Sequence, residues 1–274
     1  MDTFALALGA GGARGLAHIH ALRAFEDLGI KPKMIAGTSI GFVIGCAACA
    51  GMSSEAIKDH IFSKISNRLN LMSDIFKVRA SSWESFLKDG GFRLGELNLE
   101  RIFGAFLPTE ILISFRDLSI PLRVAATDFY AANTTVFDDG PLRPALAASS
   151  AIPGIFLPVE LNDRYFIDGS ATNPCPLELL HGQADHIIAI DVSGGPDRRK
   201  RGRPSKIDAI YSSNQMMQMS ITSRLAVSHP NAIVFQPPLD GIRSLDFLKA
   251  NEVLAETEGF TNEVKRAIER LASS

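Results

Sequence analysis

A serine flanked by glycines is the residue of this chain best placed to act as a nucleophile. The motif Gly37-Thr38-Ser39-Ile40-Gly41 lies between a short apolar run and an apolar helical pattern, as in a nucleophile elbow. Such a turn crowds the serine backbone, so it requires small residues two positions before and after the serine. It also places Ser39 at a helix N-terminus, where free N–H groups and the helix dipole favour developing negative charge. The alternative is an ordinary glycine-flanked turn.

A second glycine-rich turn, Gly11-Gly12-Ala13-Arg14-Gly15, follows the first apolar run. In a parallel sheet this turn should lie beside the Ser39 turn, and its glycines let backbone N–H groups point into a shared cavity, as an oxyanion hole requires. We expect Arg14 either to fix the loop or to face an anionic group. A dinucleotide fingerprint is the rival interpretation. However, Arg14 stands where that fingerprint needs its third glycine, and no acidic residue ends the second strand.

A nucleophilic serine needs a base, and no histidine of this chain follows a strand in a turn that would present it. Asp168 is placed in such a turn, because Tyr165-Phe166-Ile167 predicts a strand and Asp168-Gly169-Ser170 predicts the turn that ends it. A pair of Ser39 and Asp168 is therefore the economical hypothesis, although Asp-Gly is also a common ordinary turn. Asp128 and Asp191 end apolar runs as well, and we interpret both as structural carboxylates.

The elements around these motifs predict an α/β fold. Residues 4–8 and 34–37 each predict a strand followed by a glycine turn and a helix, which indicates a parallel sheet covered by helices. Further strands are expected at residues 122–127, 134–137, 165–167 and 186–190, and the middle two are expected to be antiparallel or hairpin strands. Helical spacing predicts an insertion over one sheet edge at 53–115, a helix at 207–228 and one or two amphipathic helices at 245–272.

Composition excludes several classes of protein. The 274 residues are 46% hydrophobic and 21% charged, and the formal charge of −2 rules out a polyanion binder that works by bulk charge. Three cysteines cannot form a complete disulfide framework, so we expect a reducing compartment. We interpret Cys46 and Cys49 as core residues of an apolar helix.

Two features of the N-terminal part bear on membranes and secretion. The N-terminus lacks a positively charged region, so no secretory signal is expected. The stretch between Lys33 and Glu55 has no charged residue and is nearly long enough to span a membrane, but glycines interrupt it. We interpret it as a strand, a tight turn and a buried helix.

Three motifs in this order, Gly11-Gly12-Ala13-Arg14-Gly15, Gly37-Thr38-Ser39-Ile40-Gly41 and Asp168-Gly169, resemble the signature of the patatin-like phospholipase family. Residues 122–128 and 148–153 also resemble family blocks, so the likeness covers roughly residues 4–195. The resemblance implies a three-layer α/β/α sandwich with a mainly parallel central sheet. It also implies a Ser-Asp dyad without histidine, and hydrolysis of lipid acyl esters without a metal or other cofactor.

Carried over by position, the resemblance makes Ser39 the nucleophile and Asp168 the base. The same carry-over assigns the oxyanion hole to N–H groups of the loop Gly11, Gly12, Ala13, Arg14 and Gly15, the elbow to Gly37 and Gly41, and the remaining motif position to Gly169. One departure is that the family usually has Gly or Ala after Asp-Gly, whereas this chain has Ser170. This residue adds a hydroxyl near the dyad.

We therefore expect a single patatin-like domain over residues 1–274, with a motif-bearing core at 4–195, an insertion at 53–115 that shapes or covers the acyl site, and a C-terminal helical region at 207–274. The expected function is a serine acyl hydrolase of lipids, a phospholipase, lysophospholipase or esterase that works through an acyl-enzyme intermediate. One alternative is a catalytically inactive protein of the same fold that binds lipid or a partner. Another is a Ser-His-Asp hydrolase.

The expected partner is a phospholipid or other acyl lipid, with no nucleic acid, and the expected location is cytoplasmic with peripheral membrane contact. The run at 198–206 has six basic residues in nine positions. We interpret it first as a solvated loop, second as a contact for anionic head groups, and only third as a DNA-binding hook. The apolar residues of the helix at 207–228 are interpreted as core packing, with acyl-chain contact as the alternative; they are Ile207, Ile210, Tyr211, Met216, Met217, Met219, Ile221 and Leu225.

Overall fold

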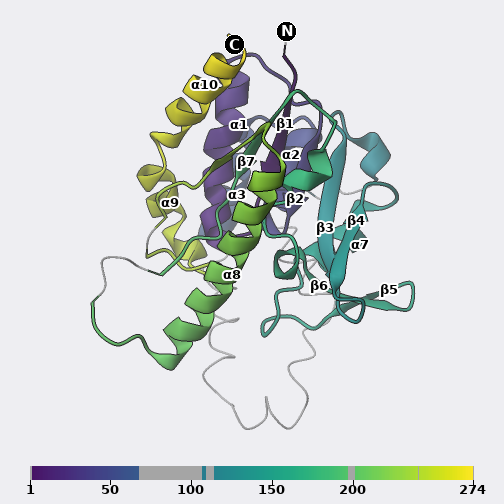
Figure 1. Ribbon diagram of the computed structural model, residues 1–274, viewed down its shortest axis with the longest axis vertical. Coiled ribbons are helices and arrows are strands. Elements are labelled where there is room, and N and C mark those ends of the chain that lie inside the picture. Colours follow the sequence, from purple (N-terminus) through teal and green to yellow (C-terminus); the bar gives the residue numbers. More distant parts are fainter. Residues whose placement is uncertain (1, 68–106, 109–113, 197–200, 240, 274) are drawn as a thin grey trace.

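The computed structural model describes residues 2–67, 107–108, 114–196, 201–239 and 241–273. Within these residues, strands form one mixed sheet in the order β5-β6-β3-β2-β1-β7-β8, with β4 paired to β3 (Figure 1). The strands are β1 Phe4–Leu8, β2 Ile35–Thr38, β3 Leu122–Asp128, β4 Asn133–Phe137, β5 Val159–Leu161, β6 Arg164–Asp168, β7 His186–Ile190 and β8 Ala232–Phe235.

Helices cover the sheet and form the C-terminal region. The α-helices are α1 His18–Asp27, α2 Ile40–Cys49, α3 Ser54–Asn67, α7 Leu142–Ser149, α8 Lys206–Ser228, α9 Ala250–Glu256 and α10 Phe260–Leu271. Short 3-10 helices are η1 Gly12–Ala17, η3 Phe115–Asp117, η4 Gly169–Ala171, η5 Leu177–Leu180 and η6 Phe247–Lys249. The predicted amphipathic tail is confirmed as α9 and α10.

Strands β1, β2, β3, β7 and β8 form a parallel sheet, which confirms the parallel arrangement that the first apolar strands predicted. β1 pairs in parallel with both β2 and β7, while β3 is parallel to β2 and β8 is parallel to β7. β4 and β6 are antiparallel to β3, which confirms the two strands expected to break the parallel pattern. The sequence prediction did not include β5 or β8.

The two faces of the sheet are covered unequally, and together they make three layers (Figure 1). Leu6 and Leu8 of β1 belong to a large core shared with α1, α2, α3, α7, α9 and α10. The alternate residues Ala5 and Ala7 face the other way and pack in a smaller cluster with η5 and the C-terminal half of α8. The parallel strands are thus buried on both faces, as α/β folds require.

The stretch from Lys33 to Glu55 forms β2 and α2 inside the large core, as expected. Cys46 and Cys49 are fully buried there, as predicted. No helix in the described part of the chain is long and apolar enough to cross a membrane. The predicted insertion at 53–115 begins with α3, but most of it lies outside the described residues, as do residues 198–200 of the basic run.

The helix predicted at 207–228 is present as α8, but its methionines do not form a core. Met216 and Met217 are 50% and 57% exposed, and Ile210 and Tyr211 are exposed too. The core interpretation is therefore wrong for these residues. The physical reason is that the face of α8 that packs against the protein carries polar side chains here, among them the buried Gln218 and Thr222.

Candidate active site

Ser39 is held in a strained turn between β2 and α2. Its backbone has φ 55° and ψ −123°, a left-handed conformation that costs a non-glycine residue on the order of 1–3 kcal/mol. A Cβ on Gly37 would come within 2.6 Å of the Phe42 backbone. A Cβ on Gly41 would overlap the Leu8 carbonyl. The turn therefore has the geometry of a nucleophile elbow, and packing explains both of its glycines.

A serine that the sequence did not single out anchors this turn. The Ser39 N–H donates a hydrogen bond to Ser149 Oγ at 3.0 Å, and that hydroxyl donates to the Ala125 carbonyl at 2.7 Å. Ser149 is fully buried at the end of α7, so it ties the elbow to β3. Its segment resembles a family block, but nothing in its residue types indicates these two bonds.

Asp168 reaches the serine because two strands meet end to end along one edge of β3. Residues 124–128 of β3 pair with β4 on one side. On the other side, Thr38 at the end of β2 pairs with Ala125, and Asp168 at the end of β6 pairs with the next residue, Ala126. Ser39 directly follows Thr38, so the sheet register brings Ser39 and Asp168 together.

Gly169 allows the chain to close over this junction. A Cβ at this position would overlap the Ala125 carbonyl and come within 2.9 Å of the Thr38 side chain. Thr127 Oγ1 also donates to the Asp168 carbonyl at 3.1 Å, which fixes the backbone of the aspartate. The glycine of the Asp-Gly motif is therefore required by close packing and not only by the turn.

The Asp168 carboxylate is buried and is surrounded by hydroxyl and amide donors. It is 2% exposed, it accepts a hydrogen bond at 2.8 Å from the Ser170 N–H, and the hydroxyls of Ser39 and Ser170 lie close enough to interact with it. Burial raises the pKa of Asp168 above its ordinary value, while the interactions with Ser39 and Ser170 oppose that rise. A carboxylate with a raised pKa is a stronger base than an exposed one.

The glycine loop packs directly against the elbow. A Cβ on Gly15 would overlap the side chain of Ile40, the residue after Ser39. Gly11 is equally close to the Val192 carbonyl, and Gly12 has φ +59° and lies against the Ser244 carbonyl. These contacts leave no room for side chains, so the loop backbone lies close to Ser39.

One of the N–H groups expected in the oxyanion hole has another partner. The Ala13 N–H donates a hydrogen bond to the Ser244 carbonyl at 2.7 Å, so it cannot donate to an oxyanion without breaking that bond. Gly11 and Gly12 come at the start of η1, where backbone N–H groups have no partner within the helix. The candidate donors therefore narrow to Gly11 and Gly12.

Arg14 fixes the loop and does not face an external anion. Its guanidinium donates to the Val192 carbonyl at 2.9 Å, the Ile242 carbonyl at 3.3 Å and Ser244 Oγ at 3.0 Å. It is 2% exposed, and burial lowers the pKa of Arg14 to about 10. Of the two roles considered for Arg14, the structure favours the structural one.

Five of the six histidines have contacts with groups other than Ser39. His18 is fully buried, and its Nε2 is 2.8 Å from the Gly9 carbonyl, so it supports the start of the glycine loop; burial lowers its pKa to about 4. His20 contacts the Leu254 carbonyl, and the rings of His181 and His229 pack against each other. His186 lies 3.7 Å from the Asp2 carboxylate. These contacts favour an aspartate rather than a histidine as the partner of the serine.

The two comparison carboxylates have structural contacts. Asp191 accepts bonds from the Ser193 N–H at 2.9 Å and from the Gln236 amide at 3.0 Å. Asp128 is paired with Arg164 at 2.6 Å. Within the described residues, no group of three or more His, Cys, Asp or Glu side chains is arranged to hold a metal ion.

Residues 6–181 match the patatin-like phospholipase family. The chain belongs to this family. Family membership confirms the patatin fold expected from the three motifs.

Relatives of known sequence extend the comparison. An uncharacterised NTE family protein of Mycobacterium tuberculosis is 34% identical over 198 residues, which cover 71% of this chain and 51% of the relative. The neuropathy target esterase sws of Drosophila melanogaster is 29% identical over 72% of this chain and 13% of its own length. The chain thus matches about half or less of these proteins. The crystal structure of VipD from Legionella pneumophila shares the fold, with a TM-score of 0.52 at 12% identity over 97% of this chain and 67% of VipD.

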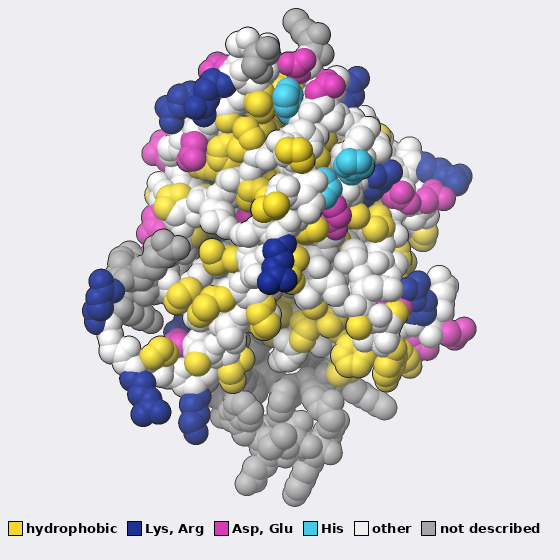
Figure 2. Space-filling view, viewed as in Figure 1, with side chains coloured by type: hydrophobic (Ala, Val, Ile, Leu, Met, Phe, Trp, Pro, Cys, Tyr) yellow, Lys and Arg dark blue, Asp and Glu magenta, His cyan; other side chains and the backbone are white. Residues whose placement is uncertain are grey.

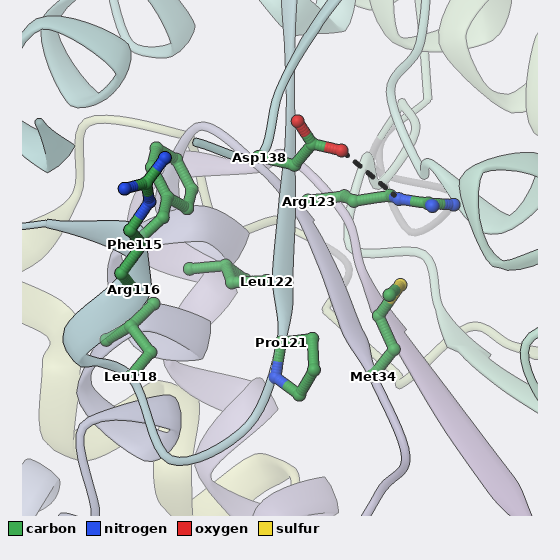
Figure 3. Close-up of a pocket in the computed structure, with 8 residues that line it drawn as sticks. All are labelled: Met34, Phe115, Arg116, Leu118, Pro121, Leu122, Arg123 and Asp138. Carbon is green, nitrogen blue, oxygen red and sulfur yellow. Dashed lines mark ion pairs between the residues drawn. The ribbon is translucent and has the colours of Figure 1, made fainter. Parts of the chain in front are cut away.

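A hollow of about 310 Å³ lies at the amino ends of the strands, opposite the end that carries Ser39 (Figure 3). It opens where β2 and β3 begin, beside Met34 and Pro121, whereas Ser39 follows the end of β2. Arg123 crosses it to pair with Asp138 at 3.7 Å and also donates to the Leu179 carbonyl at 2.6 Å. These partners occupy the Arg123 guanidinium, and the hollow is separate from the dyad.

Proposed function

We propose that this chain hydrolyses lipid acyl esters with Ser39 as nucleophile and Asp168 as base. The observation that carries the proposal is that the sheet register places Ser39, at a strained elbow, beside the buried Asp168 carboxylate. The nearby glycine loop adds backbone donors on the same side of the sheet. Membership of a phospholipase family supplies the substrate class.

In the proposed mechanism Asp168 accepts the Ser39 proton while Oγ attacks the ester carbonyl. The oxyanion that forms is stabilised by the N–H groups of Gly11 and Gly12, at roughly 3 kcal/mol for each donor. The tetrahedral intermediate then expels the alcohol or lysolipid, which takes up the proton from Asp168. This leaves an acyl ester on Ser39.

Water completes the reaction. Asp168 accepts a proton from a water molecule that attacks the acyl ester, and the Ser39 hydroxyl is restored as the fatty acid leaves. The same carboxylate therefore acts twice. Its raised pKa suits both steps, since the base is stronger than an ordinary aspartate.

The test combines hydrolysis with direct labelling of the serine. Parent, Ser39→Ala, Asp168→Asn and Asp191→Asn are compared on short and long p-nitrophenyl esters and on a phospholipid and lysophospholipid panel in EDTA. A fluorophosphonate probe with mass spectrometry then identifies the modified residue. We expect labelling of Ser39, loss of turnover in the first two variants, and activity within a fewfold of the parent for Asp191→Asn.

Each alternative has a distinct outcome. Tight lipid binding without turnover or labelling by the parent would favour the inactive binding protein. If Asp168→Asn still formed the Ser39 adduct at the parental rate while one histidine variant did not, a Ser-His-Asp mechanism would replace the dyad.

A further inference from the structure

The N-terminal half of α8 has its polarity reversed. Positions facing the protein are polar and partly or fully buried, as at Ser212, Gln215 and Gln218. Among the outward positions, large apolar side chains that are 50–70% exposed stand beside the exposed Ser213 and Asn214; they are Ile210, Met216 and Met217. An ordinary surface helix has the opposite arrangement, so this apolar face needs an explanation other than folding of the chain.

Basic residues stand at the beginning of the same helix. Arg203 and Lys206 are exposed and precede the apolar positions by one to three turns, and Arg201 lies just before them. We use the name α8 docking face for Arg201, Arg203, Lys206, Ile210, Met216 and Met217. Its composition combines positive charge with flexible apolar side chains, which is typical of helices that lie in a lipid interface.

The α8 docking face lies at the catalytic end of the molecule. α8 ends at Ser228, and soon after it the Asn231 carbonyl accepts a hydrogen bond from the Ile187 N–H at the start of β7. The C-terminal end of α8 therefore lies near the amino end of β7, and its N-terminal end lies near the carboxyl ends of the strands (Figure 1). Asp208 in its first turn accepts a bond from Arg243 at 3.4 Å. Arg243 adjoins Ser244, whose carbonyl holds the glycine loop.

Figure 2 shows hydrophobic side chains gathered along α8 and, at the same end of the molecule, over the region of β3 and β6. Phe129 and Tyr130, directly after β3, are 51% and 80% exposed, and their rings pack edge to face and continue to Tyr165 of β6. Aromatic residues with one polar edge suit the boundary between lipid and water. Two apolar surfaces therefore flank the end of the sheet that carries Ser39.

We propose that the α8 docking face binds an anionic lipid surface and brings the Ser39 end of the molecule to it. The basic residues fit anionic head groups, and the apolar residues fit the region just below them. A second copy of the chain fits less well, because a symmetric interface would bring the like charges of Arg203 and Lys206 from two copies together. The inference rests on the proposed function only for the choice of lipid as partner.

Binding is measured with the Ser39→Ala protein, so that turnover does not alter the vesicles. We expect flotation with vesicles of phosphatidylcholine and phosphatidylglycerol, weak binding to phosphatidylcholine alone, and loss of binding as salt rises. Arg203→Gln with Lys206→Gln should weaken binding about 30-fold, since each basic residue contributes about fivefold near such a surface. Ile210→Asp with Met217→Asp should weaken it by roughly tenfold or more.

Val227→Asp is the matched control. Val227 is 84% exposed on the same helix but lies about 25 Å from Ile210 along its axis, at the opposite end. It should leave vesicle binding unchanged. Circular dichroism and Tm check that each variant folds, and hydrolysis of soluble p-nitrophenyl butyrate, measured with Ser39 present, should be unchanged by all of these substitutions.

Three results would overturn the proposal: equal binding to neutral and anionic vesicles, an equal loss in Val227→Asp, or a change of oligomeric state with unaltered vesicle binding. The last result would identify a second copy as the occupant. Failure of the proposed hydrolase would be seen separately, as absent ester hydrolysis by a parent that still binds anionic vesicles.

Discussion

The ends of β3 and β6 carry the same residue type in opposite environments. Asp128 ends β3 and accepts bonds from the Tyr130 and Ala131 N–H groups at 3.1 and 2.9 Å, besides its pairing with Arg164. These contacts, the Ala131 N–H first, lower the pKa of Asp128. Asp168 ends β6 among hydroxyl and amide donors, and burial raises its pKa.

This difference separates a structural carboxylate from a candidate base. Backbone N–H groups and a guanidinium stabilise the charge of Asp128, so that carboxylate has little tendency to take a proton. Burial makes the charged form of Asp168 less favourable, so it accepts a proton more readily. Position at a strand end does not distinguish the two; the surrounding donors do.

Activity should show the largest contrast between the two positions. Asp168→Asn removes the proposed base while keeping the size of the side chain, so we expect kcat to fall by roughly 10³–10⁴-fold. Asp128→Asn should keep kcat within a fewfold of the parent. Steady-state hydrolysis of a soluble p-nitrophenyl ester measures both. A comparable loss of kcat in the two variants would contradict a catalytic role for Asp168 that Asp128 does not share.

Stability should show a smaller contrast of opposite sign. At neutral pH Asp168→Asn should increase the free energy of unfolding, by roughly 0.5–2 kcal/mol, because it removes a buried charge. Asp128→Asn should decrease it, because Arg164 and two N–H groups lose their ionised partner. Thermal and denaturant unfolding at pH 7 measure both values. If Asp168→Asn lowered Tm, burial of its charge would not be the dominant effect.

The pH dependence of these differences follows from the directions of the pKa shifts. Asp168 has a raised folded pKa, so the parent loses stability as pH rises from the unfolded pKa through the folded one. Asp128 has a lowered folded pKa, so its contribution is present above the unfolded pKa and is lost as pH falls through the folded one. In acid the free energies of unfolding of both variants should therefore approach that of the parent, from above for Asp168→Asn and from below for Asp128→Asn.

The smallest effect is expected at Ser170, the position where this chain departs from the usual family pattern. Its N–H donates to Asp168 and its hydroxyl lies close enough to interact with it, which opposes the rise of the Asp168 pKa. Ser170→Ala removes the hydroxyl, so the acid limb of the kcat profile should move to higher pH while the plateau stays within a fewfold. Ser170→Thr keeps a hydroxyl and serves as the control. An unmoved limb in Ser170→Ala would mean that the hydroxyl does not tune the base.

The sequence predicted the parallel half of the fold because its strands are buried on both faces and are nearly all apolar. It did not predict β8, four residues of which only Phe235 is buried. It predicted the helix at 207–228 but not its orientation, because helical spacing identifies apolar positions without saying which face the rest of the fold covers.

The site was predictable where a motif encodes local geometry. Gly37 is explained by a contact within its own turn, with the Phe42 backbone, whereas Gly41 and Gly169 pack against Leu8 and Ala125 of other strands. The partners of Ser149 and Ala13 could not be predicted, because these bonds join residues more than 20 positions apart and depend on the folded topology.

The meeting of β2 and β6 along β3 also has a consequence for how the protein loses function. β6 is joined to β3 by three residue pairs, from Ala126 with Asp168 to Asp128 with Phe166, whereas β1 pairs with β2 and β7 inside the large core. Opening of this short ladder would separate the two proposed catalytic residues while the parallel strands remain folded. Inactivation in denaturant should then precede the loss of helical signal, so the enzyme's activity would report a local opening that spectroscopy of the whole molecule does not detect.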